Sequence, residues 1–165
     1  MSLFGAIETS ASGLTAQRLR LDLIANNIAN INTTRTAETT EGGNPIPYRR
    51  QVAVFQPREA ENNFSQELGL AMGSSGSTNS AGRGVQVAAV IEDQSPFALE
   101  YNPDSPDAAK VDEPGIPAGY VRKPNVDILT ETVDMMSASR AYEANVTVLN
   151  ASKAMSKKAL EIGRG

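Results

Sequence analysis

Apolar residues near the beginning of the chain recur at alternating steps of three and four positions. This spacing is the a/d pattern of a heptad repeat, which is typical of an α-helix that packs along one face. It predicts a helix from about Ser2 to Ile31, in which Ser10 and Gln17 are polar positions that weaken the pattern. The members of this N-terminal seam are Leu3, Ile7, Leu14, Leu21, Ile24, Ile28 and Ile31.

A second seam with the same spacing lies near the end of the chain and predicts a helix from about Val126 to Ile162. Asn125 follows Pro124 and is the expected N-cap of this helix, and Gly163 suits its C-terminal end. The members of this C-terminal seam are Ile128, Thr132, Met135, Ser139, Tyr142, Val146 and Leu149.

Both predicted helices also carry apolar residues outside their seams. A two-helix coiled coil buries one stripe on each helix, so a second stripe needs a second partner. That partner is either a small domain of the same chain or a neighbouring subunit. The second stripe of the C-terminal helix comprises Leu129, Val133, Met136, Val148, Met155 and Ile162.

The middle of the chain differs from both ends. All nine prolines lie between Pro45 and Pro124, and proline breaks helix interiors. Partly alternating, β-branched runs predict strands at 48–55, 84–91, 97–101 and 119–122, which we expect to form one small antiparallel sheet. Gly/Ser/Asn-rich residues 69–84 predict a loop, and residues 102–119, rich in proline and acidic residues, predict an irregular, solvent-exposed one.

The predicted fold class is therefore α+β, with the two terminal helices paired as a coiled coil and a small β-rich middle domain. We expect the N-terminal helix of the coiled coil in residues 1–34, the middle domain in 35–124 and the C-terminal helix in 125–165.

Composition excludes several kinds of chemistry. The 165 residues contain no His, Cys or Trp, which removes Ser–His–Asp triads, Cys–His dyads and cysteine or histidine zinc sites. The net charge of −4 argues against a nucleic-acid-binding protein. Carboxylates gather in the middle segment, at Glu92/Asp93, Asp104/Asp107 and Asp112/Glu113, but without calcium-loop spacing. We expect solvated acidic loops there, no catalysis, no metal and no cofactor.

An unusual run of asparagines lies in the last part of the N-terminal seam, which continues through it at Ile28 and Ile31. Residues 25–32 read Ala-Asn-Asn-Ile-Ala-Asn-Ile-Asn, although asparagine is a poor helix former. One interpretation is a fraying helix end, because asparagine tolerates the left-handed cap conformation. The other is a polar ladder inside an assembly, because the carboxamide both donates and accepts hydrogen bonds.

At these residues the sequence resembles the bacterial flagellar basal-body rod and hook proteins. Residues 11–17 and 20–33 resemble the N-terminal signature of that family, and residues 125–127, 135–136 and 140–145 resemble its C-terminal signature. Four stretches of the middle, 33–38, 47–50, 94–97 and 120–122, resemble the proximal-rod members in particular. The resemblance covers nearly the whole chain, with departures at 62–82 and 102–118.

The resemblance implies a structural subunit that stacks helically into a hollow periplasmic rod and transmits motor torque to the hook. It implies export by the flagellar type III apparatus without cleavage of a signal peptide, and the first eight residues lack the basic and long apolar regions of such a peptide. The implied partners are copies of the chain, the other rod subunits FlgB, FlgF and FlgG, and the basal adaptor FliE. Another axial protein of the family, or a generic coiled-coil adaptor, is the alternative.

The seams, the asparagine run and the two signatures together mark the expected assembly interface. Its residues are Leu14, Leu21, Ile24, Asn26, Asn27, Ile28, Asn30, Ile31, Met135, Met136, Arg140, Tyr142, Glu143, Asn145, Val146, Leu149 and Met155.

Overall fold

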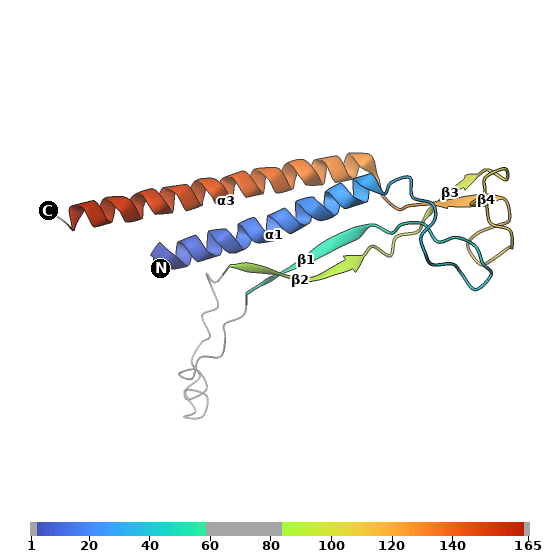
Figure 1. Cartoon of the computed structure of the whole chain (residues 1–165), viewed down its shortest axis with the longest axis horizontal. Helices are drawn as coiled ribbons and strands as arrows, with labels where there is room; N and C mark the ends of the chain where they lie inside the picture. The colour runs from blue at the N-terminus through green and yellow to red at the C-terminus, as the bar shows by residue number, and fades with distance from the viewer. Residues whose placement is uncertain (1–2, 59–83, 164–165) are drawn as a thin grey trace, which may run out of the picture. The chain divides into compact units, whose positions relative to one another are not determined.

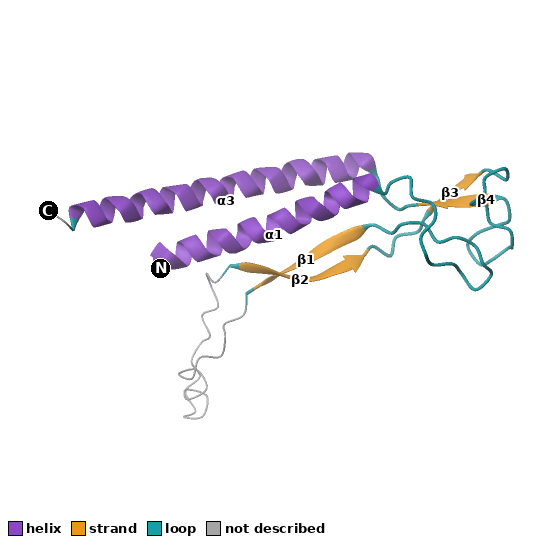
Figure 2. Ribbon diagram, viewed as in Figure 1, coloured by secondary structure: helices purple, strands orange, loops and turns teal. Residues whose placement is uncertain are grey.

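A computed structural model describes residues 3–58 and 84–163 of the chain (Figure 1). In this part of the chain a long helix lies at either end, and short strands lie between them (Figure 2). The helices are α1, Leu3–Ala29, and α3, Ile128–Ile162; the strands are β1, Gln51–Pro57, β2, Val85–Glu92, β3, Ala98–Tyr101, and β4, Tyr120–Lys123. The α+β class expected from the sequence is confirmed. The loop expected at 69–84 lies, apart from Gly84, outside the described residues.

The strands form two separate two-stranded sheets, β1–β2 and β3–β4, so the expectation of one sheet was wrong. The β1–β2 pair is antiparallel, because the Asp93 N–H donates to the Arg50 carbonyl at one end and the Arg58 N–H to the Gly84 carbonyl at the other. In the antiparallel β3–β4 pair, Leu99 lies opposite Arg122 and Tyr101 opposite Tyr120.

The chain divides into two compact units. Unit 1 comprises Met1–Leu19, Val54–Ala89 and Ser139–Gly165, and unit 2 comprises Arg20–Ala53 and Val90–Ala138. Each helix contributes one segment to each unit, so residues from both ends of the sequence meet in both units.

Small residues bring the helices together in unit 1. Ser10 and Ala16 of α1 and Ser152 of α3 are buried. A Cβ at Gly13 would lie 3.0 Å from the Asn145 side-chain nitrogen, so the lack of a side chain there lets Asn145 pack against α1. Ser10, expected to weaken the seam, hydrogen-bonds instead to the Ala6 carbonyl at 3.0 Å. Close approach of small side chains thus replaces the large apolar contacts of an ideal heptad seam.

Strand β2 is attached to α1 within the same unit. The Val85 N–H donates to Ser12 Oγ at 3.1 Å. The preceding residue is Gly84, whose φ of +92° lies in the left-handed region, and a Cβ there would collide with the Ser12 hydroxyl. Glycine satisfies the backbone angle and the close approach at once.

The β3–β4 sheet, its connection and the segment that follows α1 share a small core within unit 2. Its buried side chains come largely from the connection between β3 and β4 and from the segment that follows α1. They are Asn44, Pro47, Ala108, Ala109, Ile116 and Val121.

The expectation of an irregular, exposed loop at 102–119 holds for most of these residues, but the acidic residues Asp107 and Glu113 are half-buried and paired. The Asp107 carboxylate accepts a hydrogen bond from Thr34 at 2.6 Å and pairs with Arg35. The Glu113 carboxylate accepts one from Thr40 at 2.7 Å and pairs with Arg122. These acidic residues have partners in other segments, which the local sequence pattern does not reveal.

The start of α3 and the end of α1 each differ by two residues from expectation, whereas α3 ends at Ile162 as predicted. Helix α3 begins at Ile128, and Asp127 is its N-cap instead of Asn125. The Asp127 carboxylate accepts hydrogen bonds from the N–H groups of Leu129 and Thr130 at 3.2 and 3.3 Å. Helix α1 ends at Ala29, two residues before Ile31, and the Asn30 side chain donates to the Asn26 carbonyl at 2.9 Å.

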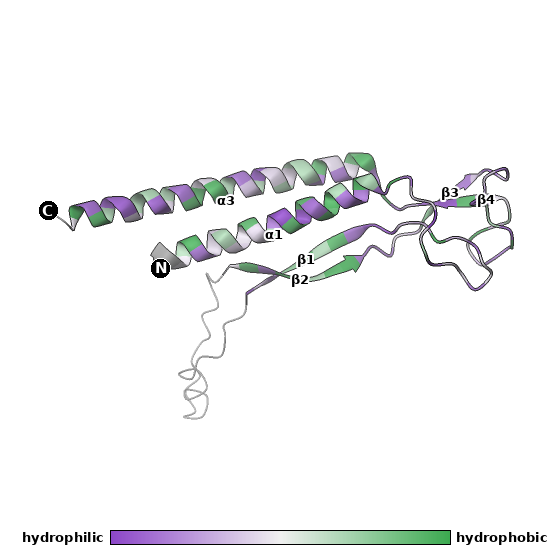
Figure 3. Cartoon of the chain, in the orientation of Figure 1, coloured by the Kyte–Doolittle hydropathy of each residue, from purple (hydrophilic) through white to green (hydrophobic). Residues whose placement is uncertain are grey.

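The C-terminal seam is only partly inward-facing. Ile128 and Tyr142 were expected on it, but Ile128 is 54% exposed and Tyr142 is also exposed. The residues of the second stripe are exposed throughout, and Figure 3 shows the apolar positions that recur along α3. Burial on this helix falls instead on Glu131, Ala138 and Ser152. Small and polar residues, which the heptad pattern ignores, thus form its inner face.

Packing of the β3–β4 connection is tested by Ile116→Ala. Ile116 is 1% exposed, so we expect the free energy of unfolding to fall by about 2–5 kcal/mol. Val111→Ala is the matched control in the same connection: Val111 is 50% exposed, so its loss should stay below about 0.5 kcal/mol. Urea unfolding of the full-length chain measures both. Equal losses would mean that this connection does not have the core described above.

Candidate functional site

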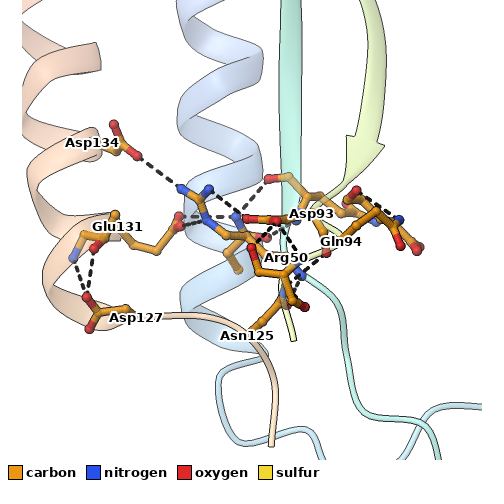
Figure 4. Close-up of polar contacts among 12 residues, drawn as sticks. Arg50, Asp93, Gln94, Asn125, Asp127, Glu131 and Asp134 are labelled. Carbon is orange, nitrogen blue, oxygen red and sulfur yellow. Dashed lines mark hydrogen bonds and ion pairs between the residues drawn. The ribbon is translucent and has the colours of Figure 1, made fainter. Parts of the chain in front are cut away.

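A buried carboxylate lies at the centre of unit 2. Glu131, in the first turn of α3, has a side chain that is 0% exposed. Its carboxylate accepts a hydrogen bond from Arg50 Nε at 2.5 Å (Figure 4). It accepts another from the Asn27 side-chain nitrogen at 3.2 Å. A buried charge is tolerated only where partners compensate its lost hydration. The burial of Glu131 therefore depends on these two residues.

Arg50 connects three carboxylates. Besides Glu131, its guanidinium pairs with Asp134 at 3.2 Å and with Asp93 at 3.6 Å (Figure 4). Burial lowers the pKa of Arg50, but the hydrogen bond with Glu131 and the nearby carboxylates outweigh burial and raise it above its ordinary value. Asp134 also pairs with Arg20 of α1 at 2.8 Å. The start of α3 is thus tied electrostatically to α1 and to the residue before β1.

The asparagine run contributes a buried contact to the same cluster. The Asn27 carboxamide donates to the Gln51 carbonyl and accepts from the Gln51 N–H, both at 3.0 Å. The Tyr48 hydroxyl donates to the same Asn27 oxygen at 2.8 Å. Burial, with the charges of Glu131 and Glu92, raises the pKa of Tyr48 above its ordinary value. Asn27 therefore fixes β1 against α1, which a fraying helix end would not do.

Asn125 holds the segment that leads into α3. Its side-chain oxygen accepts from the Arg50 N–H at 2.8 Å, and its side-chain nitrogen donates to the Asp93 carbonyl at 3.0 Å (Figure 4). The Asp93 carboxylate accepts hydrogen bonds from the hydroxyl and N–H of Ser95, which together with Arg50 lower the pKa of Asp93. The ends of β1 and β2 and the start of α3 therefore converge on one polar network, which we call the Arg50 cluster: Asn27, Tyr48, Arg50, Asp93, Asn125, Glu131 and Asp134.

The chemistry of the Arg50 cluster is structural. Its carboxylates pair with guanidinium groups, and Glu131 also accepts a hydrogen bond from an amide; within residues 3–58 and 84–163 no group of acidic residues is arranged to hold a metal ion. In the same described residues, no helix is long and apolar enough to span a membrane.

The opposite face of α3 is apolar and open to solvent. In unit 2, Leu129 is 71% exposed, and Ile128, Val133 and Met136 are exposed beside it on the same turns that place Glu131 inward. Within unit 1 the exposed apolar residues of this helix are Tyr142, Val148, Met155, Leu160 and Ile162. Leu129, Val133 and Met136 follow i, i+4, i+7 spacing and share the side of α3 opposite Glu131, and we call these three residues the α3 apolar face. Contiguous exposed apolar surface is typical of interaction sites.

The structure places the expected interface residues in three settings. Ile24 and Asn27 are buried within the chain itself. Nine are half-buried: Leu14, Leu21, Ile28, Asn30, Ile31, Met135, Asn145, Val146 and Leu149. Six are exposed: Asn26, Met136, Arg140, Tyr142, Glu143 and Met155. Whether they contact a neighbouring subunit stays a prediction.

Sequence reasoning missed the two central residues of the Arg50 cluster. The sequence pattern places Arg50 in a predicted strand and in a family-like stretch but gives it no partner, and it assigns Glu131 no role. A signal was present, because Glu131, Met135 and Ala138 follow helical spacing and lie on the inward face. A lone carboxylate on that face implies a cationic partner elsewhere.

Comparison with known proteins gives a consistent result. Residues 7–35 match the family described as flagella basal body rod protein, and residues 118–162 match the C-terminal region of the flagellar basal body rod FlgEFG proteins. The flagellar basal-body rod protein FlgC of Bacillus subtilis is 46% identical, over 99% of this chain and 100% of its own length. FlgC of Borreliella burgdorferi is 47% identical over 100% of both chains, and FlgC of Escherichia coli O6:H1 is 41% identical over 99% of this chain and 100% of its own.

The chain belongs to the flagellar basal-body rod protein family. The resemblance found in the sequence is thereby confirmed, and the family is one of structural proteins. The chain is accordingly a structural rod subunit that assembles with other proteins of the flagellar basal body.

The dependence of Glu131 on Arg50 is tested by Arg50→Met in this rod protein. The substitution keeps the aliphatic stem and leaves a buried carboxylate without its cation, so we expect a loss of about 3–5 kcal/mol in the free energy of unfolding. The double variant Arg50→Met/Glu131→Leu should recover much of that loss, because no unpaired charge remains in the core.

Arg58→Met is the matched surface control for this pair. Arg58 pairs with Glu8 where both side chains are largely exposed, so its loss should stay below about 1 kcal/mol. Chemical unfolding of all four proteins gives the comparison. Similar losses for Arg50→Met and Arg58→Met would contradict a structural role for the Arg50 cluster.

The N-cap of α3 predicts a specific acid sensitivity. Hydrogen bonds from Thr130 and Leu129 lower the pKa of Asp127 in the folded chain below its ordinary value of 3.8. Its stabilising contribution is therefore present above the unfolded-state pKa and is lost as the pH falls through the lower folded-state pKa.

Asp127→Ser retains a capping oxygen that does not titrate. When the pH falls below 3.8, we expect the melting temperature of the parent chain to fall by more than that of this variant. Near neutral pH the two should melt at similar temperatures. Parallel acid profiles would exclude titration of the cap.

Proposed function

We propose that the chain is a subunit of the proximal rod of the flagellar basal body, where copies assemble helically into a rigid segment that transmits motor torque to the hook. Support comes from its full-length similarity to FlgC proteins and from the α3 apolar face. An apolar face on a long helix is a costly feature for a subunit that stays alone, because its burial between subunits is favourable by roughly 25 cal/mol per Å².

The α3 apolar face is the observation that carries this proposal. It lies on the first turns of α3 in unit 2, and further exposed apolar residues of the same helix lie in unit 1, among them Val148, Met155 and Ile162. Exposed apolar residues in both units suit contacts with neighbouring subunits, as in repeated, heterologous contacts that build a filament. The inward face of the same helix is already occupied by Glu131, Ala138 and Ser152.

Within the subunit we propose that α1 and α3 pair as a coiled coil that forms the inner tube, with the β-rich middle on the outside. Contacts in each unit support pairing. In unit 1, α1 accommodates Asn145 opposite Gly13. In unit 2, Arg20 of α1 pairs with Asp134 of α3. The proposed boundaries are residues 1–34, 35–124 and 125–165.

The proposed partners are further copies of the chain, FlgB, FlgF and FlgG in the rod, and FliE at its base. We propose that the flagellar type III export apparatus delivers the subunit to the periplasm without cleavage of a signal peptide. The lack of cysteine suits this route, because nothing in the exported chain requires or undergoes disulfide formation.

Leu129→Asp tests the assembly role of the α3 apolar face. Leu129 is highly exposed and lies in the first turn of α3, where a carboxylate favours the positive end of the helix dipole. The isolated variant should therefore fold with nearly unchanged stability. In a strain that lacks the native gene, we expect it to be produced but to yield no complete basal bodies and no swimming, because assembly would bury the charge.

Leu129→Met is the control, since it keeps an apolar side chain of similar volume and should restore swimming. Swimming assays and electron microscopy of basal bodies read the outcome. Normal basal bodies with Leu129→Asp would exclude this face from the assembly.

A further inference from the structure

Strand β3 has a free edge in the described structure. The β3–β4 sheet has two strands, and β3 has no pairing partner on its other side within residues 3–58 and 84–163. All four residues of β3 are exposed. The opposite edge of the sheet is covered, because the Tyr120 carbonyl of β4 accepts the Ala109 N–H at 2.8 Å.

The hydrogen-bond register identifies which residues of β3 face outward. The Asn102 N–H donates to the Gly119 carbonyl, so this pair continues the ladder as a hydrogen-bonded pair. Hydrogen-bonded and non-hydrogen-bonded pairs alternate in an antiparallel ladder. Leu99 and Tyr101 therefore belong to non-hydrogen-bonded pairs, and their N–H and C=O groups point away from β4.

The same two residues carry exposed apolar side chains. Tyr101 is 65% exposed, although its ring lies 5.1 Å from that of Tyr120, and Leu99 is also exposed. Proteins usually protect a free edge with charged residues or proline. Here the charged residues are Glu100 of β3 and Lys123 of β4, which form an ion pair. Glu100 alternates with Leu99 and Tyr101 along β3, so these two apolar side chains stay open to solvent.

We propose that β3 is a docking edge that accepts an extended segment of a neighbouring rod subunit as an additional strand. This inference rests on the proposed rod function. Outward N–H and C=O groups specify the occupant, because an extended backbone pairs with both groups at each of two residues. Pro96 and Pro103 bound the available edge, so the added strand pairs with only about four residues.

The geometry also defines the chemistry of the occupant. Its residues beside Leu99 and Tyr101 are apolar, and the intervening residue is polar and faces the side of Glu100 and Lys123. A second β3 is a poor occupant, because antiparallel pairing of two identical edges gives a closed two-fold dimer and cannot propagate along a rod.

Amide exchange tests the docking edge directly. The full-length chain is compared as the free subunit and within purified basal bodies, at residue resolution. We expect exchange of the Leu99 and Tyr101 amides to slow by on the order of tenfold or more on assembly, because both become hydrogen-bonded. The Glu100 amide, which already faces β4, should change much less.

A backbone substitution provides an independent test. Leu99→Pro removes an outward N–H without removing a hydrogen bond to β4. An edge strand tolerates proline at such a position, because the lost N–H faces solvent. We expect the variant to fold but to fail in swimming complementation, whereas Leu99→Ala, which keeps the N–H, retains swimming. If Leu99→Pro does not fold, Tyr101→Lys replaces it, because lysine on an edge opposes strand addition.

The outcomes separate this inference from the proposed function. If the chain is absent from purified basal bodies, the rod function itself is wrong. If the chain is present but the Leu99 and Tyr101 amides exchange at the free-subunit rate, only the docking edge is wrong. Normal swimming with a folded Leu99→Pro or Tyr101→Lys variant also overturns the docking edge.

Discussion

Burial of one carboxylate, that of Glu131, constrains the architecture of unit 2. A fully buried charge has to keep its compensating partners. Here the partners are distant in the sequence: Asn27 belongs to α1, and Arg50 directly precedes β1. Apolar packing alone would permit several arrangements of similar energy. The polar network selects one, because moving either segment leaves a charge or an amide unsatisfied in the interior.

This constraint lets α3 serve two roles within its first turns. The inward side holds the Arg50 cluster, and the outward side presents Leu129 and Val133 to solvent. A helix whose orientation is fixed by directional contacts does not rotate to hide its exposed apolar residues. These apolar side chains therefore stay in contact with water, which is unfavourable, until another surface covers them.

Much of the fold was predictable from local patterns, whereas the contacts that position it were not. Periodicity identified both helices and the four strands found in residues 3–58 and 84–163, because burial on one face repeats with the geometry of each element. It misplaced Ile128 and missed Glu131, because heptad reasoning assigns burial by hydrophobicity and here small and charged residues are inside. The bonds of Asp107 and Glu113 join segments about seventy residues apart, and spacing within one loop carries no sign of them.

The reciprocal pair between Asn27 and the Gln51 backbone has a mechanical consequence. The Asn27 carboxamide takes the place of a peptide group beside β1. It pairs with both the N–H and the carbonyl of Gln51, which fixes the position of α1 along the strand. Rotation of α1 by one residue position turns a side chain by about 100° and breaks both bonds together. Apolar contacts carry no such directional requirement. Any shift of α1 against β1 within unit 2 therefore has to break both hydrogen bonds at once.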